Sequence, residues 1–287
     1  MNLNDLLQAE QLDPETTLVL RHVPRERELR KVLPWLAAEK PAVFNAYQQT
    51  QNPKVEKQML KAKHVVSFVG YGAGKALFVG LYEMRGAKTV TLVELRKLAA
   101  QQQLVKYGVN LDGPRTEQLL FDLELTQHFS KWKGKLVVRW PAPEISWARW
   151  AVKNQIEVEA INEESVLDAN MPEWRDLLVT WDELHVMPKK WKAKLEEWRG
   201  IYFILDKHTG KGYVGAAYGK ENILGRWTGY MNTGHGNNKR LLTCEPSNLR
   251  FSILERVSPD MEAKEIINLE TSWKDRLHTR EHGLNGN

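Results

Sequence analysis

The stretch that decides the fold of the C-terminal region is GIYFILDKHTGKGYVGAAY, residues 200–218. GIYFILD alternates and then becomes continuously apolar, as a β-strand does, and GYVGAAY has the same character. The HTGKG sequence between them supplies Gly210 and Gly212, which can adopt the positive φ of a tight turn. The two runs therefore predict an antiparallel hairpin.

Helical patterns surround this hairpin. Downstream, we expect helices around Asn222–Tyr230 and Ala263–Leu277. Upstream, the segment from Met171 to Arg199 is rich in Trp and Lys and also predicts helix. We interpret residues 166–197 as a helical connector and residues 198–287 as an α+β domain, in which helices flank a small antiparallel sheet.

The first part of the chain has a different texture and is expected to form an N-terminal domain over residues 1–165. Residues 1–62 predict mostly helix and loop, with one short strand at Thr16–Arg21. From Val65, short apolar runs alternate with Gly and Pro, which predicts a compact, mainly antiparallel sheet or small barrel over residues 65–140. VTLVEL, residues 90–95, is expected to be one of its strands.

Gly70–Ala76 reads GYGAGKA and resembles a phosphate-binding P-loop. It is one residue too short before the Gly-Lys pair, and Ala76 stands where a P-loop has the Ser or Thr that binds Mg²⁺. A strand, LFVGLY, follows it instead of a helix. We therefore predict a glycine-rich turn between two strands.

Composition limits the classes of function. The chain has 287 residues, a net charge of +5 and a pI of about 9.1, which suits a polyanionic partner because Lys and Arg release counterions when they neutralise phosphates. A single cysteine, Cys244, excludes a disulfide framework within the chain. No secretory signal or bilayer-spanning apolar stretch is present, so we expect a cytoplasmic protein with no membrane partner.

Five elements of the C-terminal domain follow one another in a specific order. They are Gly200-Ile201-Tyr202, Tyr213-Val214-Gly215, Arg226 in LGRWTGY, Glu270 in INLETSWKDRL and Asn285 in HGLNGN. This order and spacing resemble the GIY-YIG nuclease domain over residues 198–287. The resemblance implies a GIY-YIG fold and a metal-dependent endonuclease that hydrolyses phosphodiester bonds.

The resemblance also implies a role for each residue. Tyr202, beside Tyr213 on the hairpin, would accept the proton of the attacking water. Arg226 would grip a phosphate oxygen with its planar guanidinium. Glu270 would be the oxygen ligand of Mg²⁺ or Mn²⁺, which keeps several of its waters in such sites. Asn285 would orient the Glu270 side chain or contact a phosphate.

One position departs from the family pattern. Many members carry histidine one helical turn after the arginine, where this chain has Tyr230. His235 lies nearby and is an alternative to Tyr202 as proton acceptor, because histidine is the side-chain type that exchanges protons near neutrality. Lys239 and Arg240, in the same loop, are expected to meet the backbone of the nucleic acid.

The N-terminal region resembles, more locally, the segment that precedes the nuclease domain in uncharacterised bacterial GIY-YIG proteins. The matching pieces are LRHV (20–23), FNAYQQTQ (44–51) and ALFVGLY (76–82). The expected sheet, which carries aromatic residues, is similar to a PUA-like barrel, and such barrels can hold an extruded base between aromatic faces. The alternative is that these aromatics fill the barrel; they are Tyr71, Phe78, Tyr82, Trp140 and Trp147.

These patterns favour a DNA endonuclease of the restriction or anti-phage defence type, in which the N-terminal domain selects a double-stranded target. Two alternatives stay open on the sequence: a non-catalytic nucleic-acid-binding protein with a nuclease-like docking domain, and a nuclease directed at RNA. A single active site cuts one strand at a time, so cutting both strands would imply a homodimer or two successive events.

Overall fold

The computed structural model describes residues 1–111, 115–168 and 171–286. The chain divides into two compact units, Met1–Ala169 and Asn170–Asn287. Both units combine helices with strands, so the α+β class is confirmed. In the described part of the chain, no helix is both long enough and apolar enough to span a membrane.

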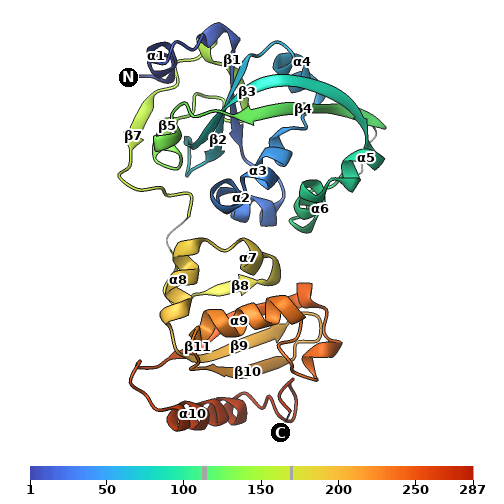
Figure 1. Cartoon of the computed structure of the whole chain (residues 1–287), viewed down its shortest axis with the longest axis vertical. Coiled ribbons are helices and arrows are strands. Elements are labelled where there is room, and N and C mark those ends of the chain that lie inside the picture. Colours follow the sequence, from blue (N-terminus) through green and yellow to red (C-terminus); the bar gives the residue numbers. More distant parts are fainter. Residues whose placement is uncertain (112–114, 169–170, 287) are drawn as a thin grey trace. The chain divides into compact units, whose positions relative to one another are not determined.

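The N-terminal unit is built on a curled sheet (Figure 1). Within the described residues its strands lie in the order β6-β1-β2-β3-β5-β7, and β4 pairs with β3. β1 and β2 are parallel and the other pairs are antiparallel, so the mainly antiparallel sheet is confirmed. The similarity to a PUA-like barrel stays a prediction. The strands are β1 (Thr17–His22), β2 (His64–Gly70), β3 (Lys75–Thr91), β4 (Glu117–Leu125), β5 (Leu136–Arg139), β6 (Ala148–Trp150) and β7 (Val158–Ile161).

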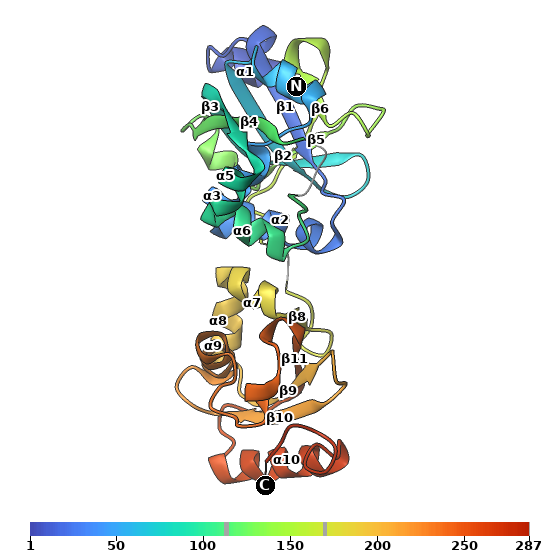
Figure 2. The same cartoon turned by 90° about the vertical axis from the view of Figure 1, so that its right-hand side faces the viewer.

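Helices cover this sheet. α2, α3, α5 and α6 gather on one side of it (Figures 1 and 2), while α1 lies at the N-terminus. The glycine-rich segment from Gly70 joins β2 to β3 as a turn, as predicted. The helices are α1 (Leu3–Ala9), α2 (Arg27–Glu39), α3 (Pro41–Gln48), α4 (Pro53–Met59), α5 (Leu92–Lys97) and α6 (Ala99–Lys106), with short 3-10 turns η1 (Pro14–Thr16), η2 (Ser130–Trp132) and η3 (Ala151–Lys153).

One expected strand is wrong. Residues 90–95 end β3 and begin α5, because Thr91 and Glu94 form a capping box. The Glu94 N–H donates to the Thr91 hydroxyl at 3.2 Å, and the Thr91 N–H donates to the Glu94 carboxylate at 2.8 Å. These bonds satisfy N–H groups that a helix start leaves unpaired, so the cap outweighs the apolar alternation.

The aromatics expected on this sheet are mostly core residues. Phe78, Tyr82 and Trp140 are buried, whereas Tyr71 is exposed. Phe78 packs edge-on against Phe68 within the main apolar cluster of the unit. The structure therefore favours the filling role for these buried rings.

The C-terminal unit has a smaller sheet, in which the strands lie in the antiparallel order β10-β9-β11-β8 within the described residues. β9 and β10 form the predicted hairpin, and α9 and α10 are the two helices expected downstream. The elements are β8 (Leu178–Thr180), α7 (Trp181–Val186), α8 (Lys189–Glu197), β9 (Gly200–Asp206), β10 (Gly212–Ala217), α9 (Asn222–Thr233), η4 (Leu241–Thr243), η5 (Pro246–Asn248), β11 (Leu249–Arg256) and α10 (Ala263–Arg276).

The segment that we interpreted as a connector, residues 166–197, is largely part of the C-terminal unit. β8 pairs with β11, with Val179 opposite Phe251. A capping box between Thr180 and Glu183 then starts α7 directly after the strand. Burial of Val179 and Phe251 and this cap give residues 178–197 a fixed place in the unit.

The hairpin strands separate two faces of the small sheet. Successive side chains of a strand point to opposite faces, so Ile201 and Tyr202 do so. Ile201 and Val214 form an apolar cluster with Ile266 of α10. Tyr202 instead contacts Tyr230 of α9. α10 therefore covers one face, and α9 covers the face that carries the hydroxyl groups (Figure 1).

Candidate active site

The two motif glycines make room for the hairpin and its tyrosine. Gly200 has φ +155, and a Cβ there would overlap the Glu255 carbonyl of β11. Gly215 lies opposite Tyr202 in the hairpin, and a Cβ there would overlap the tyrosine ring and hydroxyl. Glycine is needed at both positions because the backbone, or the ring, passes where a side chain would begin.

Three tyrosines from three places meet on the α9 face of the sheet; we call Tyr202, Tyr213 and Tyr230 the tyrosine cluster. Their ring centroids lie 6.2 to 6.4 Å apart in each pairing. The Tyr202 and Tyr230 hydroxyls share a hydrogen bond of 3.0 Å. Tyr202 and Tyr230 are fully buried, while Tyr213 is half-buried. Only one hydroxyl-bearing ring of the cluster is therefore substantially open to a substrate.

Arg226 joins this cluster from α9, one helical turn before Tyr230. Its Nε donates to the Tyr202 hydroxyl at 3.3 Å. Arg226 is exposed to solvent. Its guanidinium is therefore held at Nε, while the remaining nitrogens are accessible to a ligand. Such a planar fork matches the geometry of phosphate oxygens. The structure thus brings together Tyr202, Tyr213, Arg226 and Tyr230.

Burial controls the protonation of these hydroxyls. It raises the pKa of Tyr202, and Tyr213 raises that pKa further, while Arg226 and the bond to Tyr230 oppose the shift without cancelling it. Burial also raises the pKa of Tyr230, with added contributions from its two tyrosine neighbours. An ordinary tyrosine is already protonated near pH 7, and the raised pKa values make Tyr202 and Tyr230 still harder to ionise.

Glu270 comes from the other long helix of the unit. It lies on α10, which packs against the Ile201 face of the sheet. Its Oε1 forms an ion pair with Lys274 at 2.8 Å, one helical turn later. Within the described residues, no hydrogen bond links Glu270 to the tyrosine cluster. Lys274 was not among the predicted site residues, although the i, i+4 spacing of a Glu and a Lys on a helix is the signal of such a pair.

The fit of a divalent metal rests on this one carboxylate. Mg²⁺ commonly takes one or two protein carboxylates and keeps several waters. Glu270 is partly exposed, and one of its oxygens is outside the Lys274 pair. The described residues contain no group of three or more His, Cys, Asp or Glu that could hold a metal. Glu270 thus suits a sparsely ligated, hydrated Mg²⁺ or Mn²⁺ and not a protein cage.

Asn285 is held against the backbone of the hairpin. Its Oδ1 accepts from the Val214 N–H and its Nδ2 donates to the Val214 carbonyl, both at 2.8 Å. The buried amide thereby pairs with the backbone of β10 as another strand would. These two bonds use one donor and one acceptor site of the amide, and the expected role of Asn285 toward Glu270 or a phosphate stays a prediction.

The loop after α9 carries the remaining candidates. His235 is half-buried, and its Nδ1 accepts from the Asn237 N–H at 3.1 Å, which leaves Nε2 as the outward nitrogen. Arg240 Nη1 donates to the carbonyls of Arg280 and Gly283, so this residue fastens the C-terminal segment. Lys239 is exposed.

Comparisons with known proteins match the C-terminal unit to one family. The GIY-YIG catalytic domain family matches residues 199–285. A solved structure of the catalytic domain of homing endonuclease I-TevI shows 27% identity and a TM-score of 0.27, covering 31% of this chain and 98% of that one. A mutant of the same intron endonuclease domain shows 26% identity and a TM-score of 0.26, covering 31% and 92%. A search of curated proteins found no match. With its motif strands paired and its arginine beside the tyrosines, the C-terminal unit is a GIY-YIG catalytic domain, and the chain that carries it is an endonuclease.

Proposed function

We propose that this protein is a metal-dependent DNA endonuclease whose C-terminal unit hydrolyses the phosphodiester bond and whose N-terminal unit selects the target. The observation that carries the proposal is the Arg226 guanidinium, held by the Tyr202 hydroxyl at 3.3 Å at the edge of the tyrosine cluster. This arrangement offers a phosphate a positioned cation, with the half-buried Tyr213 of the same cluster as the accessible hydroxyl. A positioned cation stabilises the charge that develops during hydrolysis.

Within this proposal, Arg226 binds a non-bridging phosphate oxygen through its exposed edge. Tyr202 orients Arg226 as a neutral hydroxyl, because burial raises its pKa and makes it a poor base near neutrality. Tyr213, the accessible member of the cluster, would then be the proton acceptor of the attacking water. This assignment departs from the role that the family resemblance implies for Tyr202.

Glu270 would hold the metal, with Lys274 sharing or releasing its Oε1. When bound, Mg²⁺ or Mn²⁺ supplies positive charge for the phosphate and the leaving oxygen. Asn285 contributes by fixing β10, and therefore Tyr213, through its two bonds to Val214. Lys239 would contact the DNA backbone, whereas Arg240 would act mainly by holding the C-terminal segment.

A role in restriction or anti-phage defence follows as part of this proposal. A nuclease that shares a compartment with its own genome needs a means of sparing it, and the separate N-terminal unit offers one. The DNA would be double-stranded, and cleavage of both strands would involve a homodimer or two successive cuts. We place the activity in the cytoplasm.

The first test is incubation of the whole protein with mixed double-stranded DNA, with Mg²⁺ or with EDTA, followed by gel electrophoresis. We expect fragments only with the metal, and none from a Glu270→Gln variant. A parallel reaction with RNA addresses the other nucleic acid. Absence of DNA cleavage with both Mg²⁺ and Mn²⁺, despite tight binding, would contradict the proposal and favour the docking-module alternative.

A further inference from the structure

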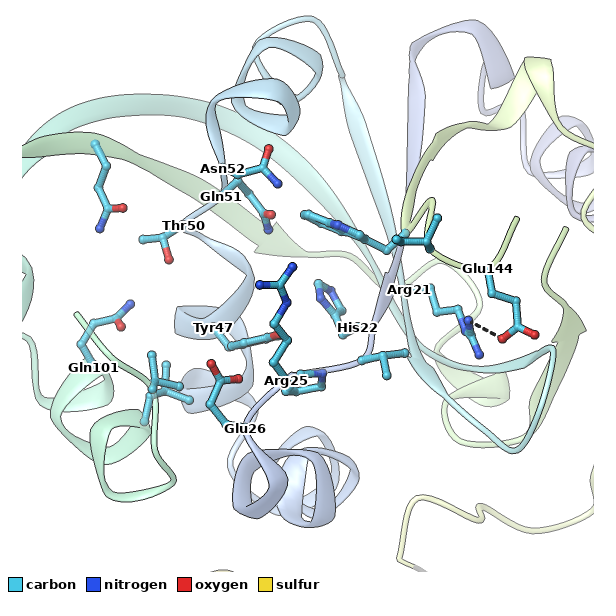
Figure 3. Close-up of a pocket in the computed structure, with 17 residues that line it drawn as sticks. Arg21, His22, Arg25, Glu26, Tyr47, Thr50, Gln51, Asn52, Gln101 and Glu144 are labelled. Carbon is cyan, nitrogen blue, oxygen red and sulfur yellow. Dashed lines mark hydrogen bonds and ion pairs between the residues drawn. The ribbon is translucent and has the colours of Figure 1, made fainter. Parts of the chain in front are cut away.

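The N-terminal unit contains a pocket of about 830 Å³ that the proposed cleavage chemistry does not use (Figure 3). It lies where the end of β1, α3, α6 and the loop between β5 and β6 come together. Its volume is within the range of sites that hold a small organic ligand. The groups that matter below are Arg25, His22, Tyr47, Gln51, Gln101 and Ile145.

We propose that this pocket receives one nucleotide extruded from the DNA, with its base against Tyr47 and its phosphate at Arg25, and that Ile145 fills the gap left in the duplex. The proposal rests on the proposed function, because it specifies how the N-terminal unit would select a target. Its occupant is identified from the chemistry of the pocket wall.

Aromatic and neutral groups form the inner part of the pocket. The His22 ring packs edge-on against both Phe44 and Tyr47, with centroids 5.5 Å apart in each case. Burial lowers the pKa of His22 to about 4, so the imidazole is uncharged near neutrality. An uncharged, ring-lined surface suits a planar heteroaromatic ligand, which gains from stacking and pays no penalty for burying a charge.

The histidine also has a defined hydrogen-bonding sense. Its Nε2 lies 3.3 Å from Gln48 Oε1, which accepts from the Ser67 hydroxyl at 2.5 Å as well. Because that oxygen only accepts, the neutral ring places its proton on Nε2 and leaves Nδ1 as an acceptor. His22, Gln48 and Ser67 are all buried, which fixes the orientation of the ring.

The amide side chains of the wall still have hydrogen-bonding capacity. Gln101 Nε2 donates to the Ala46 carbonyl, and Gln51 Nε2 donates to the Gln48 carbonyl, both at 2.8 Å. Among the described residues, neither amide oxygen has a hydrogen-bond partner. Neutral acceptors of this kind match the amino groups on a base edge. The Glu26 carboxylate lies beside Arg25 and Tyr47 in Figure 3.

Arg25 provides the charge for a phosphate. Its side chain extends into the pocket beside Tyr47 and His22 in Figure 3. In the described part of the chain its guanidinium makes no hydrogen bond or ion pair, unlike Arg21, which pairs with Glu144 at 3.1 Å. An unpaired arginine next to neutral ring and amide groups is the combination that a nucleotide requires.

The position of Ile145 indicates that the nucleotide in the pocket would belong to a DNA strand and would not be a free nucleotide. It lines the pocket, yet it is 84% exposed at the loop between β5 and β6. Binding of a free nucleotide would not explain why an apolar side chain stands exposed to water at the rim of the pocket. An apolar side chain beside a base pocket can instead insert into the base stack, as apolar wedges do in DNA-bending proteins.

The loop that carries Ile145 is held firmly. Arg149 Nη2 donates to the carbonyls of Pro141 and Pro143 at 2.9 Å, and its Nε donates to the Ser146 carbonyl at 3.0 Å. Trp140 Nε1 donates to the same Ser146 carbonyl at 3.1 Å. These bonds keep the loop from folding back and burying its isoleucine, which is what a wedge needs.

The test measures binding of the full-length protein in EDTA to short duplexes, either fully paired or carrying one bulged A, C, G or T. Extruding an unpaired base costs less free energy than extruding a paired one, because no base pair is broken. At least one bulged duplex should therefore bind roughly tenfold or more tightly than the paired duplex. Arg25→Ala, Gln51→Ala and Ile145→Ala should each reduce this ratio severalfold. Arg27→Ala and Ile161→Ala, at exposed positions outside the pocket, should preserve it.

The ratio separates the pocket from general backbone binding, because loss of a plain phosphate contact weakens both duplexes equally. Competition with free nucleoside 5′-monophosphates should leave the bulge preference intact. No preference for any bulge, preference unchanged in all three pocket variants, or an Arg25-dependent affinity for free mononucleotides alone would overturn the proposal. Cleavage of paired DNA with Mg²⁺ is recorded on the same preparation: cutting without bulge preference refutes only the pocket, and preference without cutting refutes only the endonuclease.

Discussion

The pocket of the N-terminal unit and the tyrosine cluster of the C-terminal unit use polar groups in opposite ways. In the cluster, the Tyr202 and Tyr230 hydroxyls bind each other and Tyr202 holds Arg226, so the geometry is complete before a ligand arrives. In the pocket, the Arg25 guanidinium makes no hydrogen bond or ion pair within the described residues, and the amide oxygen of Gln51 has no hydrogen-bond partner there. A prearranged site suits chemistry, and a site with spare donors and acceptors suits recognition.

The largest effect is expected at the metal ligand of the cutting site. Glu270→Gln removes the negative charge while keeping the shape, and it should lower single-turnover cleavage by about a thousandfold or more, since a catalytic metal contributes several kcal/mol. Binding to DNA in EDTA should change little. Glu281→Gln, at an exposed position nearby, is the matched control. Cleavage by Glu270→Gln at the wild-type rate would remove Glu270 from the mechanism.

The next effect sharpens the distinction between positioning and proton transfer. Tyr202→Phe removes the hydroxyl that holds Arg226 and should slow single-turnover cleavage by about a hundredfold. Because burial raises the pKa of Tyr202, its hydroxyl keeps its proton near neutrality and its loss should leave the shape of the pH–rate profile there unchanged. Tyr213→Phe removes the proposed proton acceptor and should change that shape. Tyr218→Phe, which alters an exposed ring, serves as control. A changed profile in Tyr202→Phe alone would restore Tyr202 as the proton acceptor.

The buried phenols also predict how stability depends on pH. The pKa of Tyr230 is raised above the ordinary value of about 10, so the unfolded chain loses its proton first as the pH rises. The contribution to stability is complete below pH 10 and falls above it, by up to about 1.4 kcal/mol per pH unit. Tyr230→Phe should therefore flatten the loss of unfolding free energy between pH 9 and 11, roughly the range in which unfolded tyrosine titrates. An equally steep loss in the variant, by urea unfolding, would contradict this burial effect.

The smallest effect is expected at His235. Its loop position lets it assist substrate placement, but its ring is not joined to the tyrosine cluster by any hydrogen bond in the described residues. His235→Ala should reduce cleavage only about threefold to tenfold, well below typical general-base contributions. Single-turnover rates at saturating protein would test this. A dead His235→Ala enzyme beside an active Tyr213→Phe enzyme would reverse the assignment.

Much of the cutting site could be predicted from the sequence, because its signals are local. Strand alternation and the Gly210 turn gave the hairpin, and Arg226 and Tyr230 are one helical turn apart. The role of Asn285 could not be predicted, because its partner Val214 is 71 residues away and backbone pairing by a side chain leaves no pattern. Nor did the sequence indicate that burial would keep Tyr202 neutral.

The pocket could not be predicted from the sequence, for the same physical reason. Its wall comes from separate segments, with Arg25 before α2, Gln51 after α3 and Gln101 on α6, and no spacing joins them. Of the aromatic residues considered for a base site, Phe78 and Trp140 belong to the core, which is the alternative that the sequence left open, whereas Trp147 lines the pocket. Thr91 and Glu94 show the converse case, because their capping box is a local signal that was present in the sequence and that the apolar run in VTLVEL obscured.

The most direct test of the division between recognition and cutting compares the whole chain with a fragment of residues 171–287, which lies within one compact unit. Both are given genomic DNAs that differ in base modification, with Mg²⁺, and the ends of the fragments are sequenced. We predict that the C-terminal fragment still cuts, but without the site or modification preference of the whole chain. Cleavage by the fragment at the same sites with the same selectivity would contradict the account, because the N-terminal unit would then have no part in choosing the target.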